Sequence, residues 1–259
     1  MPKLFIVATP IGNLKDMTLR AIETLREVDF ILAEDTRVTK KLLTHLGIHK
    51  TVISFHEYSK DKSLEKIFDL LNEGKNLALV TDAGTPGISD PGQRLINFLT
   101  SNYQATQSGG PGFFVATKTL KTRADALRTF SIPYDLANRG QIEIIPVPGP
   151  SAISALLSIS DIDCSEFLFL GFPPRKKGRQ TFFKRVATSE VPVILFESPH
   201  RIQKTLRELK MVAGDRHCNI GRELTKIYEE VFRGTLSEAE KHFVGEKQRG
   251  EFVLVVDIQ

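Results

Sequence analysis

The sequence predicts an α/β protein built from two α/β domains, and three observations support this. Apolar runs typical of strands alternate with segments of helical periodicity as far as about residue 160. After residue 161, strand-like runs follow one another closely, with one clear helix among them. Loops rich in glycine and proline follow several strands of the first part. We therefore expect a parallel-sheet domain over residues 1–161 and an α+β domain over residues 162–259.

The N-terminal domain is expected to alternate strands and helices. Its strands are predicted at residues 3–9, 29–35, 51–57, 76–82 and 142–147. Its helices are predicted at residues 16–28, 37–48 and 62–74, after residue 92 and after the loop 148–152. Asp16 or Thr18 could cap the first helix, and Gly47 would end the second. This alternation indicates a parallel sheet with helices packed on it.

The C-terminal domain is expected to hold short strands and one main helix. The strands are predicted at residues 166–172, 191–197, 219–224, 229–235 and 251–258, and the helix at residues 200–212.

Composition sets broad limits on the function. The hydrophobic fraction is 41% and the charged fraction 25% over 259 residues, which is ordinary for a soluble globular protein. We expect no membrane span and no signal peptide, because no apolar run is long enough and the N-terminal run suits a strand. Two cysteines provide neither a disulfide framework nor a metal cluster, so a cytoplasmic location is expected. The net charge of +4 permits a nucleic-acid partner without requiring one.

Four loops follow predicted strands of the N-terminal domain, three of them with glycine and proline and one of them charged. They are TPIGN (9–13), AEDTR (33–37), TDAGTPGISDP (81–91) and PGPSA (148–152). Ligands of open parallel sheets bind beyond the carboxyl ends of the strands. None of the four matches the phosphate-binding P-loop or the dinucleotide pattern GxGxxG. A single such loop is more often a plain turn, but four on one edge favour a ligand site.

The loop AEDTR carries charges of both signs at a strand end. Glu34 and Arg37 are candidate functional residues there. Asp35 is equally well explained as the residue that caps the following helix.

Taken in order, the motifs TPIGNLKDMTLRA, AEDTR, TDAGTPGISDPG, VPGPSA, ESPHRI and GEFVLVV closely resemble the ribosomal RNA small subunit methyltransferase I family. This family belongs to the tetrapyrrole-methylase-like class of S-adenosylmethionine enzymes and methylates a cytidine 2′-hydroxyl in 16S rRNA. The resemblance covers the chain except about residues 101–140. It implies two α/β domains of the tetrapyrrole methylase type, with the cofactor S-adenosylmethionine in the cleft between them.

The resemblance also implies which residues contact the cofactor. These are Pro10, Gly12, Asp82, Gly84, Thr85, Gly87, Ile88, Ser151 and Ala152. The long loop is then expected to hold the cofactor through backbone N–H and C=O groups that glycine brings close. Tetrapyrrole methylases carry Gly-Asp-Pro where this chain has Gly84-Thr85-Pro86, which argues against a porphyrin substrate.

Methyl transfer to a ribose hydroxyl benefits from a base or an oriented hydrogen bond. The candidates are Glu34, Asp35, Glu197 and His200, with Glu34 or Asp35 preferred. Arg37 would position a phosphate or one of these carboxylates. No metal is required, and the pair His45 and His49, which lacks a third ligand, is expected to lie on the surface.

Basic residues of the C-terminal domain are candidates for RNA binding. The loop PPRKKGRQ (173–180) holds Arg175, Lys176, Lys177 and Arg179, and SPHR adds His200 and Arg201. A charge run is often only a solvated loop, but the resemblance to rRNA enzymes favours phosphate contacts. Phe172, beside the loop, could stack on a base, although core packing is the simpler explanation.

Residues 101–140 depart from the family, whose members usually pass this point through a short turn. Connections of about two to six residues are normal at such joints. Because the segment would join the end of a returning helix to the start of a strand, we expect it at the edge of the sheet away from the cofactor, as a peripheral element.

The expected partners are 16S rRNA or the small ribosomal subunit, and a second copy in a homodimer. The alternatives are a small-molecule methylase of the same fold and an inactive RNA-binding assembly factor.

Overall fold

The computed structural model describes residues 1–107 and 142–258, and it divides into two compact units. Unit 1 consists of Met1–Thr9 and Met17–Gly149, and unit 2 of Pro10–Asp16 and Pro150–Gln259. Most of the segment predicted to be peripheral, 101–140, lies outside the described residues.

Unit 1 contains the predicted parallel sheet. Its five strands lie in the order β3-β2-β4-β1-β5, and every neighbouring pair is parallel. The strands are β1 (Lys3–Val7), β2 (Phe30–Ala33), β3 (Thr51–Ser54), β4 (Leu77–Val80) and β5 (Glu143–Val147). All four residues of β4 are buried, as expected of a central strand covered on both faces.

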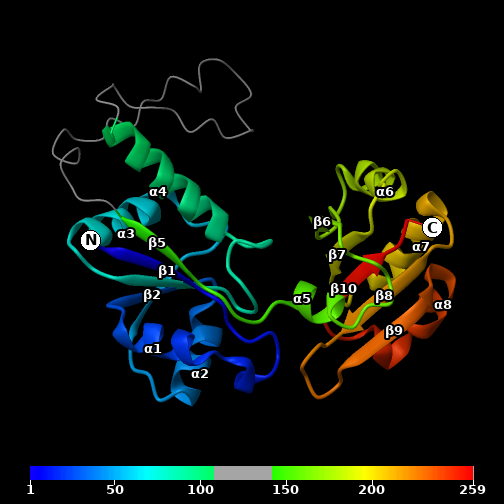
Figure 1. The fold of residues 1–259 in the computed structure, drawn as a ribbon, viewed down its shortest axis with the longest axis horizontal. Coiled ribbons are helices and arrows are strands. Elements are labelled where there is room, and N and C mark those ends of the chain that lie inside the picture. Colours follow the sequence, from blue (N-terminus) through cyan, green and yellow to red (C-terminus); the bar gives the residue numbers. More distant parts are fainter. Residues whose placement is uncertain (108–141, 259) are drawn as a thin grey trace. The chain divides into compact units, whose positions relative to one another are not determined.

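Helices cover both faces of this sheet (Figure 1). The α1 (Leu19–Glu27) and α2 (Thr36–His45) helices pack on one face, and α3 (Asp61–Asn72) and α4 (Gly92–Gln107) on the other. Alternate strand residues face opposite ways, so that Ile31 packs with the first pair of helices and Leu32 with the second.

Local signals explain where these helices begin and end. The Thr18 hydroxyl accepts a hydrogen bond from the Ala21 amide and caps α1, as predicted. Gly47 and Gly74 follow α2 and α3 with φ of 64° and 86°, a conformation that glycine adopts without strain.

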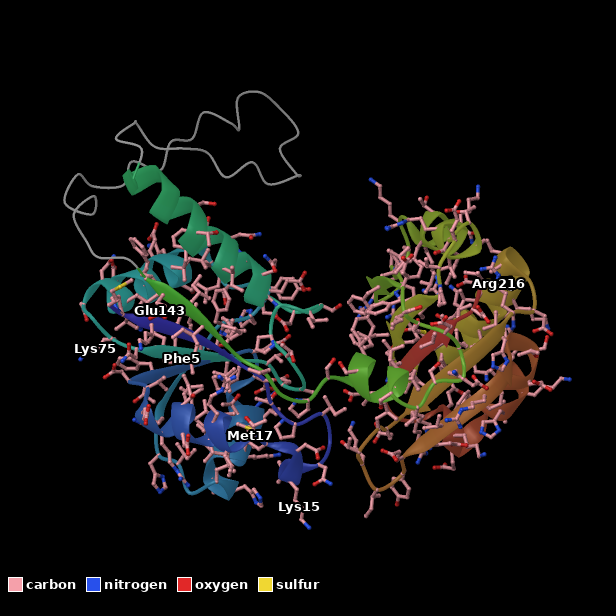
Figure 2. All side chains as sticks on the ribbon, in the orientation of Figure 1. Phe5, Lys15, Met17, Lys75, Glu143 and Arg216 are labelled. Carbon is pink, nitrogen blue, oxygen red and sulfur yellow. The ribbon has the colours of Figure 1, made fainter. Side chains whose placement is uncertain are left out.

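The register places the carboxyl ends of the strands at one edge of unit 1. Val7 pairs with Val147 and Ala33 with Val80, so the segments that follow these strands begin at the same edge. The opposite edge holds the strand starts, where Lys3 pairs with Glu143, and Lys75 and Glu143 mark it in Figure 2. We therefore find that β5 begins away from the loop edge.

Unit 2 contains a mixed sheet in the order β6-β7-β10-β8-β9, in which only β6 and β7 are parallel. The strands are β6 (Leu168–Gly171), β7 (Val193–Glu197), β8 (His217–Arg222), β9 (Glu230–Thr235) and β10 (Phe252–Val256). The predicted helix is α7 (Ile202–Ala213). The expectation of one clear helix was incomplete, because α6 (Arg179–Ala187) and α8 (Leu236–His242) pack with α7 on the same face of the sheet.

The boundary between the units falls earlier than the predicted residue 162. The short helix α5 (Ala152–Leu157) packs its Leu156 against Ile194 and Val253 on the second face of the unit 2 sheet. Ile11 joins the same apolar cluster, which explains why Pro10–Asp16 belongs to unit 2. Neither contact has a signal in the local sequence.

Candidate functional site

The glycine-rich loop that follows β4 is fixed to the end of β1. The Gly84 amide donates to the Thr9 carbonyl at 3.0 Å, and the Thr9 amide donates to the Gly84 carbonyl at 2.9 Å. Gly84 has φ of 84°, which explains why this position requires glycine. Both backbone polar groups of Gly84 are thus engaged within the chain.

The second half of the loop closes around Asp90. Its carboxylate accepts hydrogen bonds from the amides of Gly87 and Gly92. A Cβ atom on Gly92 would come within 2.9 Å of the Gly87 nitrogen, so no other residue fits there without a shift. The sequence predicts that loop amides hold the cofactor, but the amides of Gly84 and Gly87 bond other parts of the chain. These glycines therefore shape the loop, and any contact that they make with a ligand uses another surface.

Glu34 lies at the same edge, directly after β2. Its carboxylate accepts a hydrogen bond of 3.1 Å from the Thr81 hydroxyl. Burial raises the pKa of the Glu34 carboxyl above its ordinary value of 4.5, and the bond from Thr81 opposes that rise. Nearby carboxylates raise the pKa further, namely those of Asp82, Asp90 and Glu57.

Asp35 occupies the position that the capping alternative predicted. It is the N-cap of α2 and accepts from the Arg37 amide at 2.8 Å. The Arg37 guanidinium also pairs with it at 2.6 Å, and these contacts lower the pKa of Asp35 to about 2. The backbone amide of Asp35 in turn donates to Asp82. Asp35 is therefore a poor proton acceptor near neutral pH, and Glu34 is the better candidate for a base.

This edge of unit 1 fits a cationic ligand. Around Glu34 the carboxylates of Asp82, Asp90 and Glu57 gather, and Arg37 is already paired with Asp35. The sulfonium and ammonium groups of S-adenosylmethionine are positively charged and would be attracted to such an edge. Beside the carboxylates, no described residue other than the chain neighbours of Gly87 has an atom within 4 Å of the place that a Cβ on Gly87 would take, so the described part of the loop leaves space there.

The cofactor residues predicted in unit 2 have local structural roles. A Cβ on Gly12 would come within 2.3 Å of the Lys226 side chain, and the neighbouring Asn13 amide bonds the Thr225 hydroxyl at 3.1 Å. Pro10 is buried. Ser151 is the N-cap residue of α5, but its side chain makes no capping hydrogen bond. Ala152 packs against the apolar cluster on the unit 2 sheet. That these residues bind the cofactor together with the loop of unit 1 stays a prediction.

The predicted basic loop divides into exposed and buried members. Arg175, Lys176 and Lys177 are exposed, as phosphate contacts require. Arg179 is 5% exposed, and its guanidinium bonds Glu208, Thr205 and the Pro174 carbonyl while lying over the Phe183 ring. The phosphate contact predicted for Arg179 therefore needs correction, because this side chain faces the interior and fixes the loop.

Glu197 and Arg201 extend this internal network. The Glu197 side chain is fully buried and pairs with the Arg201 guanidinium at 2.7 Å. It also accepts from the Thr205 hydroxyl and from the Ser198 amide. Glu197, one of the candidate bases, is thus committed to structure, and Arg201 is anchored rather than free.

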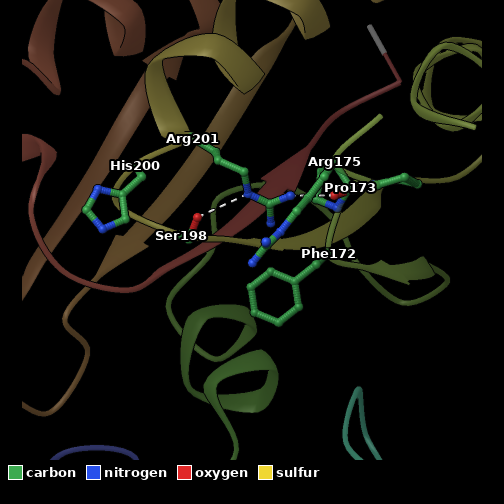
Figure 3. Close-up of a pocket in the computed structure, with 7 residues that line it drawn as sticks. Phe172, Pro173, Arg175, Ser198, His200 and Arg201 are labelled. Carbon is green, nitrogen blue, oxygen red and sulfur yellow. Dashed lines mark hydrogen bonds between the residues drawn. The ribbon is translucent and has the colours of Figure 1, made fainter. Parts of the chain in front are cut away.

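A pocket of about 660 Å³ lies beside this network (Figure 3). It is lined by Phe172, Pro173, Pro174, Arg175, Ser198, His200 and Arg201. Phe172, for which core packing was the simpler expectation, is 49% exposed. The sequence did not mark Thr81, Thr205 or Glu208 as functional, since each acts through a partner distant in the chain.

No described group of three or more His, Cys, Asp or Glu residues is placed to hold a metal ion.

The chain matches the family model of tetrapyrrole (corrin/porphyrin) methylases over residues 3–107 and 128–240. It is 41% identical to the ribosomal RNA small subunit methyltransferase I of Thermotoga maritima, over 99% of this chain and 98% of the relative. Identity to the protein of the same name from Bacillus subtilis is 39%, over 98% of this chain and 74% of the relative.

Solved structures agree on the fold. Uroporphyrin-III-C-methyltransferase from Thermus thermophilus superposes with a TM-score of 0.61 at 15% identity, covering 100% of this chain and 95% of that one. A diphthine synthase gives a TM-score of 0.61 at 14% identity, with coverages of 98% and 90%. The predicted fold class is confirmed, and the chain belongs to the ribosomal RNA small subunit methyltransferase I family, within the tetrapyrrole methylases.

Proposed function

We propose that this chain transfers a methyl group from S-adenosylmethionine to the 2′-hydroxyl of a cytidine in 16S ribosomal RNA. The observation that carries this proposal is the identity of 41% across almost the full length of a relative named as a small subunit rRNA methyltransferase. The acidic loop edge of unit 1 and the exposed basic loop of unit 2 provide the two kinds of surface that the reaction needs.

S-Adenosylmethionine, when bound, supplies a methyl group on a sulfonium that is already a good leaving group. The residues of unit 1 that would hold it are Asp82, Gly84, Thr85, Gly87 and Ile88, and those of unit 2 are Pro10, Gly12, Ser151 and Ala152. The chain's main contribution is to position the two reactants, because well-oriented groups react far faster than free ones.

Glu34 is the residue we assign to the proton of the ribose hydroxyl. Its carboxylate is half-buried, and Thr81 fixes its orientation by donating to one oxygen. Burial raises the pKa of the Glu34 carboxyl, which makes it a stronger base than an ordinary glutamate. Arg37 holds Asp35 at the start of α2 and leaves Glu34 as the better placed acceptor.

The substrate is expected to be 16S rRNA or the small ribosomal subunit, and the active form a homodimer in the cytoplasm. The structure contains no helix, within its described ranges 1–107 and 142–258, that is both long and apolar enough to cross a bilayer.

Methyl incorporation tests the proposal. The chain is incubated with tritiated S-adenosylmethionine and with small subunits, naked 16S rRNA or a porphyrin precursor. We expect label in the RNA and none in the porphyrin. The labelled nucleotide should resist alkaline cleavage, since that cleavage requires a free 2′-hydroxyl. Label in the porphyrin alone would favour a small-molecule methylase, and binding of RNA without label an inactive assembly factor.

A further inference from the structure

The pocket of unit 2 combines an aromatic ring with cationic groups. The Phe172 ring packs on Phe196 with centroids 5.4 Å apart, and Phe196 packs on Phe169 at 5.2 Å. This backing fixes the ring of Phe172, yet 49% of the residue stays exposed. An aromatic side chain that is both held in place and accessible is suited to stacking.

Arg201 is pre-oriented in the wall of the same pocket (Figure 3). Its Nε donates to the Ser198 hydroxyl, Nη1 to the Pro173 carbonyl and Nη2 to the buried Glu197. A guanidinium carries five N–H groups, so two remain for a ligand. Because the buried carboxylate already fixes the side chain, little rotamer entropy is lost when these N–H groups bind an anion.

The exposed rim of the pocket adds further basic character. Arg175 and His200 are exposed, and within the described ranges neither makes an ion pair. None of the residues that line the pocket is acidic. The walls come from the segments after β6 and β7 and from the start of α7, where the helix dipole also favours negative charge.

We propose that this pocket binds one unpaired nucleotide of an RNA strand, with the base stacked on Phe172 and the phosphate bound by Arg175 and Arg201. Its volume of about 660 Å³ lies within the usual range for small-molecule sites. Every base has a face that can stack on an aromatic ring, but a base in a duplex is already stacked on its neighbours. The pocket therefore selects single-stranded RNA, and the proposal rests on the rRNA substrate proposed above.

Binding by fluorescence anisotropy tests this assignment directly. The probe is a fluorescein-labelled single-stranded RNA of mixed sequence, compared with the same strand annealed to its complement. Phe172→Leu keeps an apolar side chain against Phe196 but removes the ring, and Phe172→Tyr keeps the ring. The matched control is Phe167→Leu, since Phe167 is 43% exposed and lies at the other end of β6.

We expect Phe172→Leu to weaken binding of the single strand about tenfold, which corresponds to about 1.4 kcal/mol. Phe172→Tyr and Phe167→Leu should bind as the wild type does, and the duplex should bind all four proteins more weakly. Arg175→Ala should lower the dependence of log K on log salt by about 0.7, the contribution of one phosphate on a single strand. Arg185→Ala, an exposed arginine of α6, should leave that slope unchanged.

Melting curves with and without S-adenosylmethionine accompany these measurements, so that loss of folding is recognised. If Phe172→Leu binds the single strand as tightly as the wild type, or if Arg175→Ala keeps the wild-type slope, the pocket is not the nucleotide site. In either case the wild type should still methylate small subunits, so the proposed function would not be affected. If the wild type does not methylate small subunits while the variants still lose affinity, the proposed function fails and the pocket assignment stands.

Discussion

Replacing Glu197 with alanine should destabilise unit 2 strongly. The Glu197 side chain is fully buried and accepts from Arg201, Thr205 and the Ser198 amide. Its removal leaves the Arg201 guanidinium beside an empty space. Loss of one partner of a buried ion pair costs about 3–5 kcal/mol. The Arg201 side chain is 22% exposed and can regain some water, so we expect the lower end, about 3 kcal/mol.

A stability loss of this size is measurable region by region. Hydrogen exchange with mass spectrometry follows peptides of unit 2 separately from those of unit 1, and it suits a chain without tryptophan. Peptides of β7, β10 and α7 should exchange faster, while those of unit 1 should not change. The melting temperature of unit 2 should fall by about 10 °C.

Two further variants serve as comparisons for the stability loss of Glu197→Ala. Glu197→Gln keeps the shape and most hydrogen bonds but loses the charge, so we expect a loss of about 1–2 kcal/mol. Glu246→Ala removes a pair with Arg249 whose two side chains are 81% and 75% exposed, and should change stability little. A loss below about 1 kcal/mol for Glu197→Ala would refute the reasoning, because removing one partner of a buried ion pair is expected to cost about 3 kcal/mol or more.

Four further changes test other parts of the structure. Glu34→Gln should lower methyl transfer at least about 100-fold, measured as tritium incorporation. The pKa of Glu34 is raised in the folded state, so the stability that its protonated form contributes is fully present below pH 4.5, its unfolded value, and is lost as the pH rises through the folded-state pKa. Glu34→Gln does not titrate. In urea titrations it should therefore be more stable than the wild type only above the folded-state pKa. Gly84→Val places a branched residue at φ of 84° and should abolish the rise in melting temperature given by S-adenosylmethionine, a rise worth about 2.7 kcal/mol at 100 times the Kd. Replacing Lys176 and Lys177 with alanine should weaken rRNA binding and flatten its salt dependence without changing cofactor affinity; unchanged filter-binding curves would show a merely solvated loop. Replacing residues 103–139 with a short Gly-Ser turn should preserve cofactor binding and most methyl transfer, and loss of cofactor binding in a folded deletion variant would contradict the peripheral placement.

The parts of the fold that the sequence predicted are those set by local pattern. Buried parallel strands are continuous apolar runs, as in Leu77–Val80, and Thr18 caps α1 through an amide three residues away. The glycines of the loop after β4 could be assigned to a ligand edge because the carboxyl ends of parallel strands must meet there.

What could not be predicted depends on contacts between distant residues. Arg179 stands in a basic run, and its burial depends on Thr205 and Glu208, which lie 26 and 29 residues further along the chain. For the same reason α6 was missed, since its start looks like part of a solvated loop. The Gly84 backbone is paired with Thr9, 75 residues away in sequence, and no local signal tells an amide that is free from one already bonded.

The position of β10 in its sheet has a consequence for synthesis. Among the described strands of unit 2, β10 comes last in the chain, yet it lies between β7 and β8 and all five of its residues are buried. Until Phe252–Val256 emerges from the ribosome, β7 and β8 each lack a neighbour and present open edges that can pair with other chains. At translation rates of about 5–20 residues per second, the roughly 30 residues between β8 and β10 prolong this exposure by about 2–6 seconds. The described sheet of unit 1 is complete once β5 has been made, so the two sheets of the nascent chain are completed at different times, and open strand edges persist longer in unit 2.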